Sequence, residues 1–193
     1  MKRLAVYCGA ASPEDPAFLE AARSVGRELA RRGIGLVYGG GRLGLMGALA
    51  DAALLEGGEV IGVIPTALID AELAHRGLSE LHVVETMHER KARFTELADG
   101  FLTLPGGTGT MDELWEAMSW AQLGYHAKPI ALLNVAGFYD ALIAFVAHMG
   151  ATGFVRPQHQ GLLIHGDDLG ELLERMAAFE PAMPIIRMTR EEL

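Results

Sequence analysis

The chain has 193 residues, half of them hydrophobic, which is enough for one well-filled core and predicts a single domain over residues 1–193. Its net charge of −9 disfavours nonspecific binding to nucleic acid or to an anionic membrane, and its one cysteine excludes an internal disulfide framework and a cysteine-based zinc site. No apolar run reaches the ~20 residues that span a bilayer, and no cleavage pattern follows the first residues, so we expect a cytoplasmic protein.

Short apolar runs alternate along the chain with longer segments of helical periodicity. The predicted strands are residues 4–8, 34–38, 60–64, 81–85, 101–104 and 129–133, with 161–165 as a weaker seventh. The predicted helices are residues 16–32, 45–56, 87–99, 110–122 and 138–148. Most strand runs are continuously apolar, as expected when both faces of a sheet are covered. The order predicts an α/β fold, a Rossmann-like doubly wound parallel sheet with helices on both faces. The tail after about residue 178 is less patterned, and we expect it to be loosely packed.

Three of the turns that leave the predicted strands are rich in glycine. They read CGAAS at 8–12, GGGRLGLMG at 39–47 and PGGTGT at 105–110. Glycine lets the backbone approach a ligand, and helix N-termini supply unpaired N–H groups, so three such turns at one sheet edge predict a phosphate site. We expect Gly40, Gly41 and Ser12 to contribute to it. Two alternatives remain: tight strand-to-helix turns also favour glycine, and Ser12 would serve equally well as a helix cap.

The middle turn contains the pattern G-x-G-x-x-G at Gly39, Gly41 and Gly44. A dinucleotide site normally has this pattern after its first strand, with an acidic residue at the end of the next strand. Here the pattern follows the second strand, and Glu59 precedes the third instead of ending it. The turn at 105–110 also lacks the lysine of a nucleotide-triphosphate loop. We therefore predict neither an NAD site nor triphosphate hydrolysis, and no cofactor.

Two charged residues stand out near the last glycine turn. If Thr110 caps the following helix, Glu113 completes a Thr-x-x-Glu capping box, which is a purely structural explanation for that acid. Arg90 falls on one helical stripe with Met87 and Phe94, so it interrupts an apolar face. Either Arg90 lies at the helix edge and extends to water, or it is buried and needs an anionic partner such as a ligand phosphate or Glu113.

The segments GGGRLGLMG, ETMHERKA (85–92), PGGTGTMDE (105–113) and WAQLGYHAKPIALLN (120–134) together resemble the Lonely Guy family of cytokinin riboside 5'-monophosphate phosphoribohydrolases. The resemblance extends from about residue 4 to the end of a helix near residue 177. It implies a Rossmann-like homodimer that hydrolyses the N-glycosidic bond of adenosine monophosphates, often N6-substituted, and releases the base and ribose 5-phosphate.

The resemblance also implies site residues. The catalytic pair of the family matches Arg90 and Glu113. The substrate contacts of the family match Glu72, Lys91, Gly107, Thr108, Gly109, Thr110, Met111, Asp112 and Ser119. Two positions differ, because Thr108 replaces a tyrosine common in plant members and Ser119 stands where threonine is frequent. The neighbour Lys91 points roughly 100° away from Arg90 around the helix, so a solvated or dimer-facing charge is the alternative for it.

The chemistry agrees with these residue types. Cleavage of a ribosyl C1'–N bond builds positive charge on the sugar, which an ionised Glu113 would stabilise, while Arg90, a poor proton donor, would orient the substrate and neutralise charge. No metal is expected, since His82 and His88 lack carboxylates at a ligand spacing. Two other classes stay open: a non-catalytic carrier of a nucleotide or phospho-ligand, and an amino-acid decarboxylase. The second is weak, because none of the three lysines lies in a recognisable pyridoxal-phosphate site.

Overall fold

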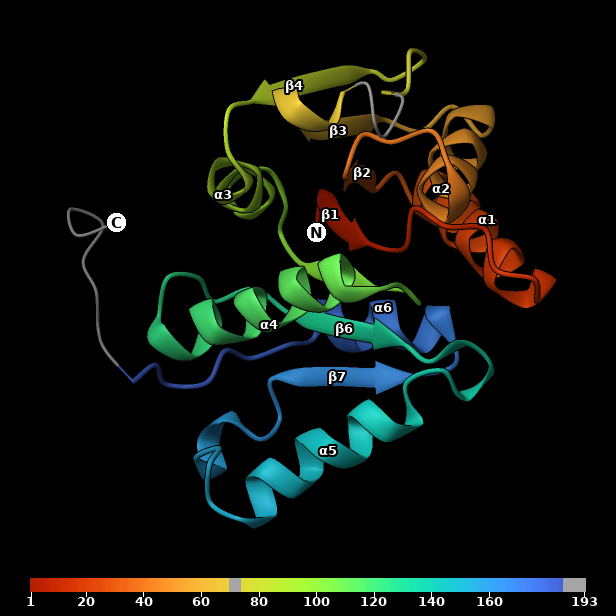
Figure 1. Ribbon diagram of the computed structural model, residues 1–193. Coiled ribbons are helices and arrows are strands. Elements are labelled where there is room, and N and C mark those ends of the chain that lie inside the picture. Colours follow the sequence, from red (N-terminus) through yellow and green to blue (C-terminus); the bar gives the residue numbers. More distant parts are fainter. Residues whose placement is uncertain (70–73, 186–193) are drawn as a thin grey trace.

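The computed structural model describes residues 1–69 and 74–185. Seven parallel strands form one sheet in the order β4-β3-β2-β1-β5-β6-β7 (Figure 1). The strands are β1 (Arg3–Tyr7), β2 (Gly35–Tyr38), β3 (Val60–Pro65), β4 (Glu80–Val84), β5 (Phe101–Thr103), β6 (Ile130–Leu133) and β7 (Leu163–Gly166). All seven predicted strands are confirmed with small shifts at their ends, and so is the doubly wound parallel sheet.

Six α-helices connect or follow the strands in the described part of the chain. They are α1 (Pro16–Arg31), α2 (Gly44–Leu55), α3 (Met87–Leu97), α4 (Thr108–Leu123), α5 (Asp140–Ala151) and α6 (Leu169–Ala177). The five predicted helices are confirmed, and α6 ends at the residue where the family resemblance ends. Within the same residues, no helix combines the length and the apolarity needed to cross a membrane.

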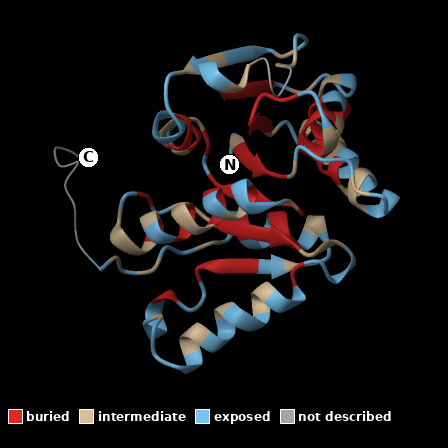
Figure 2. Ribbon diagram, in the orientation of Figure 1, coloured by how far each residue is buried: buried red, intermediate tan, exposed pale blue. Residues whose placement is uncertain are grey.

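The sheet separates two hydrophobic cores, because successive side chains of a strand point to opposite faces. From β1, Leu4 and Val6 join the core formed with α1, α2 and α6. Ala5 and Tyr7 join the other core, which contains buried residues of α3 and α4 and half-buried residues of α5. Helices therefore lie on both faces, and the central strands β1, β2 and β3 are buried except for Arg3 at the start of β1 (Figure 2).

Two elements are less covered than their apolar sequences suggest. The edge strand β4 alternates exposed and half-buried residues, with Leu81 and Val83 exposed. The helix α5 has an almost entirely apolar sequence but contains no buried residue. A helix that is apolar all round is normally buried. Its outer face is therefore a surface that the chain itself does not cover.

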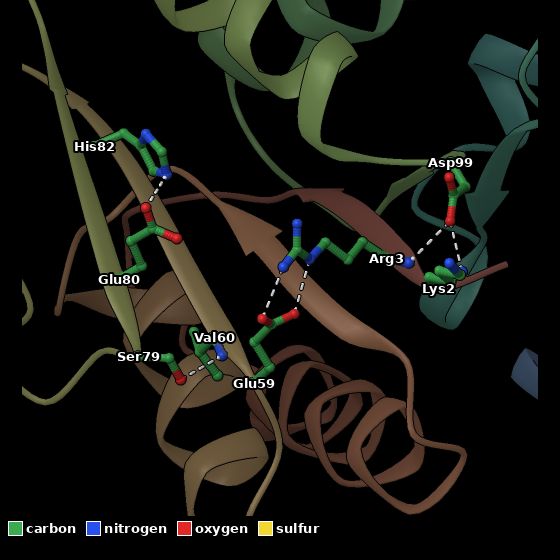
Figure 3. A network of polar contacts seen from close by, with 8 residues as sticks. All are labelled: Lys2, Arg3, Glu59, Val60, Ser79, Glu80, His82 and Asp99. Carbon is green, nitrogen blue, oxygen red and sulfur yellow. Dashed lines mark hydrogen bonds and ion pairs between the residues drawn. The ribbon is translucent and has the colours of Figure 1, made fainter.

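The amino ends of the strands, opposite the glycine turns, are joined by a polar network (Figure 3). Arg3 donates from Nε and Nη2 to the Glu59 carboxylate, at 2.8 Å each, and so connects the starts of β1 and β3. Asp99 accepts hydrogen bonds from the backbone N–H groups of Lys2 and Arg3. Because the Arg3–Glu59 pair is solvent-exposed, we expect it to contribute only about 0.2–1 kcal/mol. The network holds the amino ends of the strands together, and the glycine turns lie at the opposite, carboxyl edge of the sheet.

The described part of the tail is attached to the body at two points. The backbone N–H of Ile185 donates to Gln122 O at 2.8 Å, and the His159 ring lies 2.9 Å from Met183 O. The expectation of loose packing after about residue 178 stays a prediction. Residues 186–193 lie outside the described part of the chain.

Candidate active site

The candidate site lies at the carboxyl edge of the sheet, where the turns after β1, β2 and β5 meet. β1 lies between β2 and β5, and the chain leaves β1 and β5 toward opposite faces, which is the arrangement at which open α/β sheets commonly bind their ligands. Backbone hydrogen bonds join all three turns: Gly9 N donates to Pro105 O at 3.1 Å, and Met46 N donates to Gly9 O at 3.3 Å. The prediction that the three glycine turns share one edge is confirmed.

Some of the glycines at this edge are required by packing alone. A Cβ at Gly9 would lie 3.3 Å from the Cα of Gly106. One at Gly106 would collide with the Thr110 side chain, and one at Gly44 would collide with the carbonyls of the turn after β1. Gly44 also has a φ of +58°, which a side chain rarely adopts. These positions support the structural explanation for glycine.

Gly107 and Gly109 are different. A Cβ at either position would meet nothing within 4 Å, and neither has a positive φ. Both residues are exposed. Since neither packing nor backbone conformation requires a glycine there, the small residues leave the backbone open to a ligand. The prediction of a phosphate site therefore depends on Gly107 and Gly109.

The helix α4 begins at this open backbone. Its N-cap is Gly107, which has no side chain to satisfy the first amides. The first intrahelical bond runs from Met111 N to Gly107 O, so the N–H groups of Thr108, Gly109 and Thr110 have no helical acceptor. Such a helix end attracts an anion through these donors and through its partial positive charge. It can bind phosphate in a protein whose net charge is negative.

The predicted capping box is wrong. The helix starts two residues earlier than expected, so Thr110 is a buried helical residue beneath Gly106 and not the N-cap. Glu113 consequently lies in the second turn of α4, too far along to bond back to the cap residue. The structural explanation for Glu113 as part of a capping box is thereby removed.

Glu113 is buried against the end of β1. Only 7% of the residue is exposed. Burial raises the pKa of Tyr7 and of the Cys8 thiol, and the negative charge of Glu113 raises both further. Tyr7 is the last residue of β1, and Cys8 begins the turn after it. The negative charge of Glu113 is therefore felt where β1 meets the first of the glycine turns.

Arg90 is also buried, with 3% exposure, so the alternative in which it extends to water from the helix edge is wrong. The helix α3 starts at Met87 as predicted, because the Thr86 hydroxyl accepts from Glu89 N at 3.1 Å. This start turns Arg90 inward. Its Nε donates to Val63 O at 3.1 Å and its Nη2 donates to Gly39 O at 2.9 Å. The guanidinium therefore lies where β2 and β3 end.

Two helices thus deliver opposite charges to one edge of the sheet. Arg90 comes from α3 and lies at the end of β2, while Glu113 comes from α4 and lies at the end of the adjacent β1. Both helices pack on the same face. A buried guanidinium and a buried carboxylate beside an open helix N-terminus form a site that can hold an anion and stabilise positive charge next to it.

Lys91 has a different environment from the one predicted. Its ammonium lies 3.2 Å from Asp112 and 2.5 Å from Glu116, both on α4. Burial alone would lower the pKa of Lys91, but the hydrogen bonds that its ammonium donates to the two carboxylates raise the pKa overall. Lys91 is buried, so the solvated alternative is wrong. Its role as a substrate contact stays a prediction, and so does that of Asp112, which it binds.

The other predicted contacts are spread more widely. Ser12 is exposed, and it does not cap α1, because Asp15 is the N-cap and accepts from Ala17 N. Gly40 and Gly41 are buried, and Gly40 O accepts from the N–H of His75 at 2.9 Å. Their use by a ligand therefore stays a prediction that the geometry does not favour.

Three further predicted contacts lie away from the open backbone or outside the described residues. Ser119 is exposed and borders a separate cavity of about 240 Å³ between α4, α5 and β7. Met111 is half-buried and packs against the core beside α4. Glu72 lies outside the described residues.

Tyr139 is a contributor that the sequence did not indicate. Its buried hydroxyl donates to Leu104 O at 2.8 Å and so supports the start of the turn after β5. Burial raises its pKa, so the hydroxyl stays protonated. A lone tyrosine about 35 residues downstream of the turn gives no sequence signal of this role. As for metals, the described residues contain no cluster of three or more His, Cys, Asp or Glu able to hold an ion.

Comparison with known proteins identifies close relatives. A protein-family model described as "Possible lysine decarboxylase" matches residues 46–176. The "Probable cytokinin riboside 5'-monophosphate phosphoribohydrolase" of Oryza sativa subsp. japonica is 46% identical over 180 residues, which are 93% of this chain and 79% of the relative. A cytokinin riboside 5'-monophosphate phosphoribohydrolase of Arabidopsis thaliana is 42% identical over 180 residues, 93% of this chain and 83% of the relative.

Among solved structures, the molybdenum cofactor carrier protein of Chlamydomonas reinhardtii has a similar architecture. The TM-score is 0.70 at 22% identity, and the match covers 92% of this chain and 99% of that chain. At this identity the likeness concerns the fold alone. It agrees with the Rossmann-like architecture described above.

Proposed function

Because this chain belongs to the Lonely Guy family of cytokinin riboside 5'-monophosphate phosphoribohydrolases, we propose that it hydrolyses the N-glycosidic bond of adenosine 5'-monophosphates, including N6-substituted ones. The products are the free base, a cytokinin or adenine, and ribose 5-phosphate. In this reaction water adds its oxygen to C1', the C1'–N bond breaks, and the base leaves with the bonding electron pair and takes up a proton.

The observation that carries the proposal is the burial of two opposite charges, Arg90 and Glu113, at one glycine-lined edge. A buried charge is costly, so its position calls for a reason beyond stability. Bond cleavage builds positive charge on the ribose, and the Glu113 carboxylate would stabilise that charge or activate the attacking water. The guanidinium of Arg90 would orient the substrate and balance its charge.

The phosphate group would lie on the open N-terminus of α4. Gly107 and Gly109 leave room for it, and the unpaired amides of the first turn would donate to its oxygens. The sugar would then lie between the helix N-terminus and Glu113, which is about one and a half turns further along α4. The binding energy of the phosphate would then hold the ribose in place for cleavage.

Base release tests the proposal directly. The protein is incubated with AMP and with N6-isopentenyl-AMP, and the free base and ribose 5-phosphate are followed by chromatography. Release of both products supports the hydrolase. A protein that binds AMP in calorimetry but never cleaves either nucleotide would instead be a carrier, the alternative function.

The family description also names a decarboxylase, and the positions of the lysines argue against it. A pyridoxal-phosphate enzyme needs a lysine amine that is free to form a Schiff base. Lys91 is paired with two carboxylates, and Lys128 donates to the carbonyls of Thr95 and Ala98 at the end of α3. The third, Lys2, is exposed at the opposite edge of the sheet.

We further propose that the protein is a homodimer in the cytoplasm. The uncovered apolar face of α5 supports the dimer: Phe145 is 53% exposed, and Phe154 beyond the end of this helix is 88% exposed. Large exposed apolar surfaces commonly mark contacts between proteins. The cytoplasmic location rests on the single cysteine, Cys8, which is buried as a free thiol.

A further inference from the structure

The first glycine of the turn after β2 has no conformational reason to be glycine. Gly39 follows the last residue of β2, is buried, and is absent from the residues with positive φ. Any amino acid can adopt such a backbone. The requirement at this position must therefore come from the space around it.

That space is occupied by the guanidinium of Arg90. A Cβ at Gly39 would collide with Arg90 Nη2, and it would lie 3.2 Å from the Cε and Sδ atoms of Met46. The Met46 contacts are close but belong to a flexible side chain. The collision with Nη2 is the severe one, and it involves a group that is held in place.

Three contacts fix the guanidinium over Gly39. Nη2 donates to the carbonyl of Gly39 itself, at 2.9 Å, and Nε donates to Val63 O, at 3.1 Å. The Phe94 ring lies 5.7 Å from the guanidinium carbon, within range of a cation–π contact. The planar cation is thus held by the ends of two strands and by an aromatic ring. It cannot move away from a Cβ without losing at least one of these contacts.

Three other glycines of this turn also have reasons inside the protein. Gly40 has a φ of +79° and Gly44 a φ of +58°, and a Cβ at Gly47 would collide with the carbonyl of Arg42. None of these reasons involves a ligand. Four of the five glycines in GGGRLGLMG are accordingly explained by the shape of the turn and by the position of Arg90.

We propose that Gly39 is a positioning residue: because it has no side chain, it leaves the space that the guanidinium of Arg90 occupies. The turn after β2 then binds a cation of the protein itself, and not the phosphate of a ligand. This inference rests on the proposed function for its effect on catalysis. For the position of Arg90 it rests only on the geometry.

The test is a double-mutant cycle of Gly39→Ala with Arg90→Lys, measured as kcat/KM for base release. Lysine lacks the fork that binds both carbonyls, so Arg90→Lys alone should remove most of the contribution of the guanidinium. Gly39→Ala alone should lower kcat/KM about 10- to 100-fold, as expected when a catalytic group moves by about 1 Å. The double variant should be no less active than Arg90→Lys.

Gly35→Ala is the matched control. It lies at the other end of the same strand, and its Cβ would displace the end of the Glu59 side chain instead. We expect its kcat/KM to stay within about twofold of the wild type, since surface pairs of this kind contribute little. Full activity of Gly39→Ala, or losses that multiply in the double variant, would overturn the inference.

Two further measurements test the inference if no base release can be measured. If Gly39→Ala fails to fold with Arg90 but folds with Arg90→Lys, the guanidinium needs the space and the inference is supported; failure in both backgrounds overturns it. If the wild type cleaves no nucleotide, the proposed function fails. The Nε–H resonance of Arg90 in ¹⁵N-arginine-labelled protein still reports on the environment of the guanidinium beside Gly39. It should shift in Gly39→Ala and not in Gly35→Ala, and an unchanged resonance would refute the inference.

Discussion

The ammonium of Lys91 lies 2.5 Å from the carboxylate of Glu116, so an ion pair joins the helix that carries Arg90 to the helix that carries Glu113. Asp112 adds a second carboxylate at 3.2 Å. Lys91 directly follows Arg90, and Asp112 directly precedes Glu113. The pair is largely shielded from water, with 10% of the Lys91 side chain and 20% of the Glu116 side chain exposed. The ion pair therefore sets the spacing of α3 and α4 where their charged residues reach the site.

Replacing Lys91 with methionine should destabilise the protein. The change leaves the Glu116 carboxylate buried without its cation, and we expect the free energy of unfolding to fall by about 2–3 kcal/mol. Urea unfolding measures the loss. The double variant Lys91→Met/Glu116→Gln should recover more than half of it, whereas Lys2→Met, at an exposed position, should change nothing. A Lys91→Met protein as stable as the wild type would contradict the role of this pair.

Glu113→Gln should abolish base release in a protein that is still folded at the assay temperature. The amide keeps the shape of the side chain but removes the charge that would face the ribosyl cation, so kcat should fall at least about 100-fold. Because Arg90 and Glu113 bury opposite charges at the same edge, removal of one of these charges should lower the melting temperature, and activity is compared at a temperature where both proteins are folded. Chromatography of the free base measures the effect. Glu96→Gln on α3, an exposed residue paired with Arg93 at the surface, is the control and should keep full activity. Undiminished turnover by Glu113→Gln would rule out the carboxylate role.

Gly109→Ala should stabilise the protein and weaken phosphate binding at the same time. The new methyl group meets no protein atom, and alanine in place of glycine in a helix contributes up to about 1 kcal/mol. The same methyl group would occupy the space through which a phosphate reaches the amides, so the Kd for AMP should rise about tenfold or more. Calorimetry measures both quantities. Gly161→Ala, which also has open space around it, should leave AMP binding unchanged. If both variants bind AMP with the same Kd, the phosphate does not bind at this helix end.

His126 should make the protein less stable in mild acid. Its Nδ1 accepts from Lys128 N, so its Nε2 carries the proton donated to Ala117 O. Burial lowers its pKa to about 4, whereas the unfolded chain titrates near 6.5. The folded form therefore binds a proton less readily, and its stability is complete above pH 6.5 and falls as the pH drops toward 4.

The shift corresponds to about 3 kcal/mol across that window. His126→Gln should flatten the dependence of the unfolding free energy on pH between 6.5 and 4, while His88→Gln, an exposed residue on α3, should leave it unchanged. Denaturant titrations at several pH values measure the slope. An identical slope in His126→Gln and the wild type would show that this histidine is not the titrating group.

Phe145→Glu should separate the proposed dimer into monomers. A charge at the centre of the uncovered face of α5 would have to be buried in any interface there. Light scattering after size exclusion should show the mass of one chain for this variant and of two chains for the wild type. Leu55→Glu replaces an equally apolar exposed residue at the end of α2 and should leave the dimer intact. A wild-type mass of one chain would refute the dimer, and a dimeric Phe145→Glu would place its interface elsewhere.

The sequence by itself determined the order of strands and helices, the parallel sheet and the edge at which the glycine turns meet. These follow from local periodicity and from the rule that parallel strands need crossover helices, so they require no knowledge of distant contacts. The sequence also placed Arg90 on the helical stripe of Phe94, but it left open whether the side chain is buried or extends to water, and the structure decided that it is buried.

Only the tertiary structure decided what each charged side chain does at that edge. The helix α4 begins directly after Gly107, so Thr110 lies inside the helix and not at its cap. That Lys91 binds α4, that Gly39 leaves room for Arg90, and that Tyr139 supports the turn after β5 depend on residues far apart in the chain. Such contacts arise when helices pack on the sheet, and local sequence patterns carry no information about them.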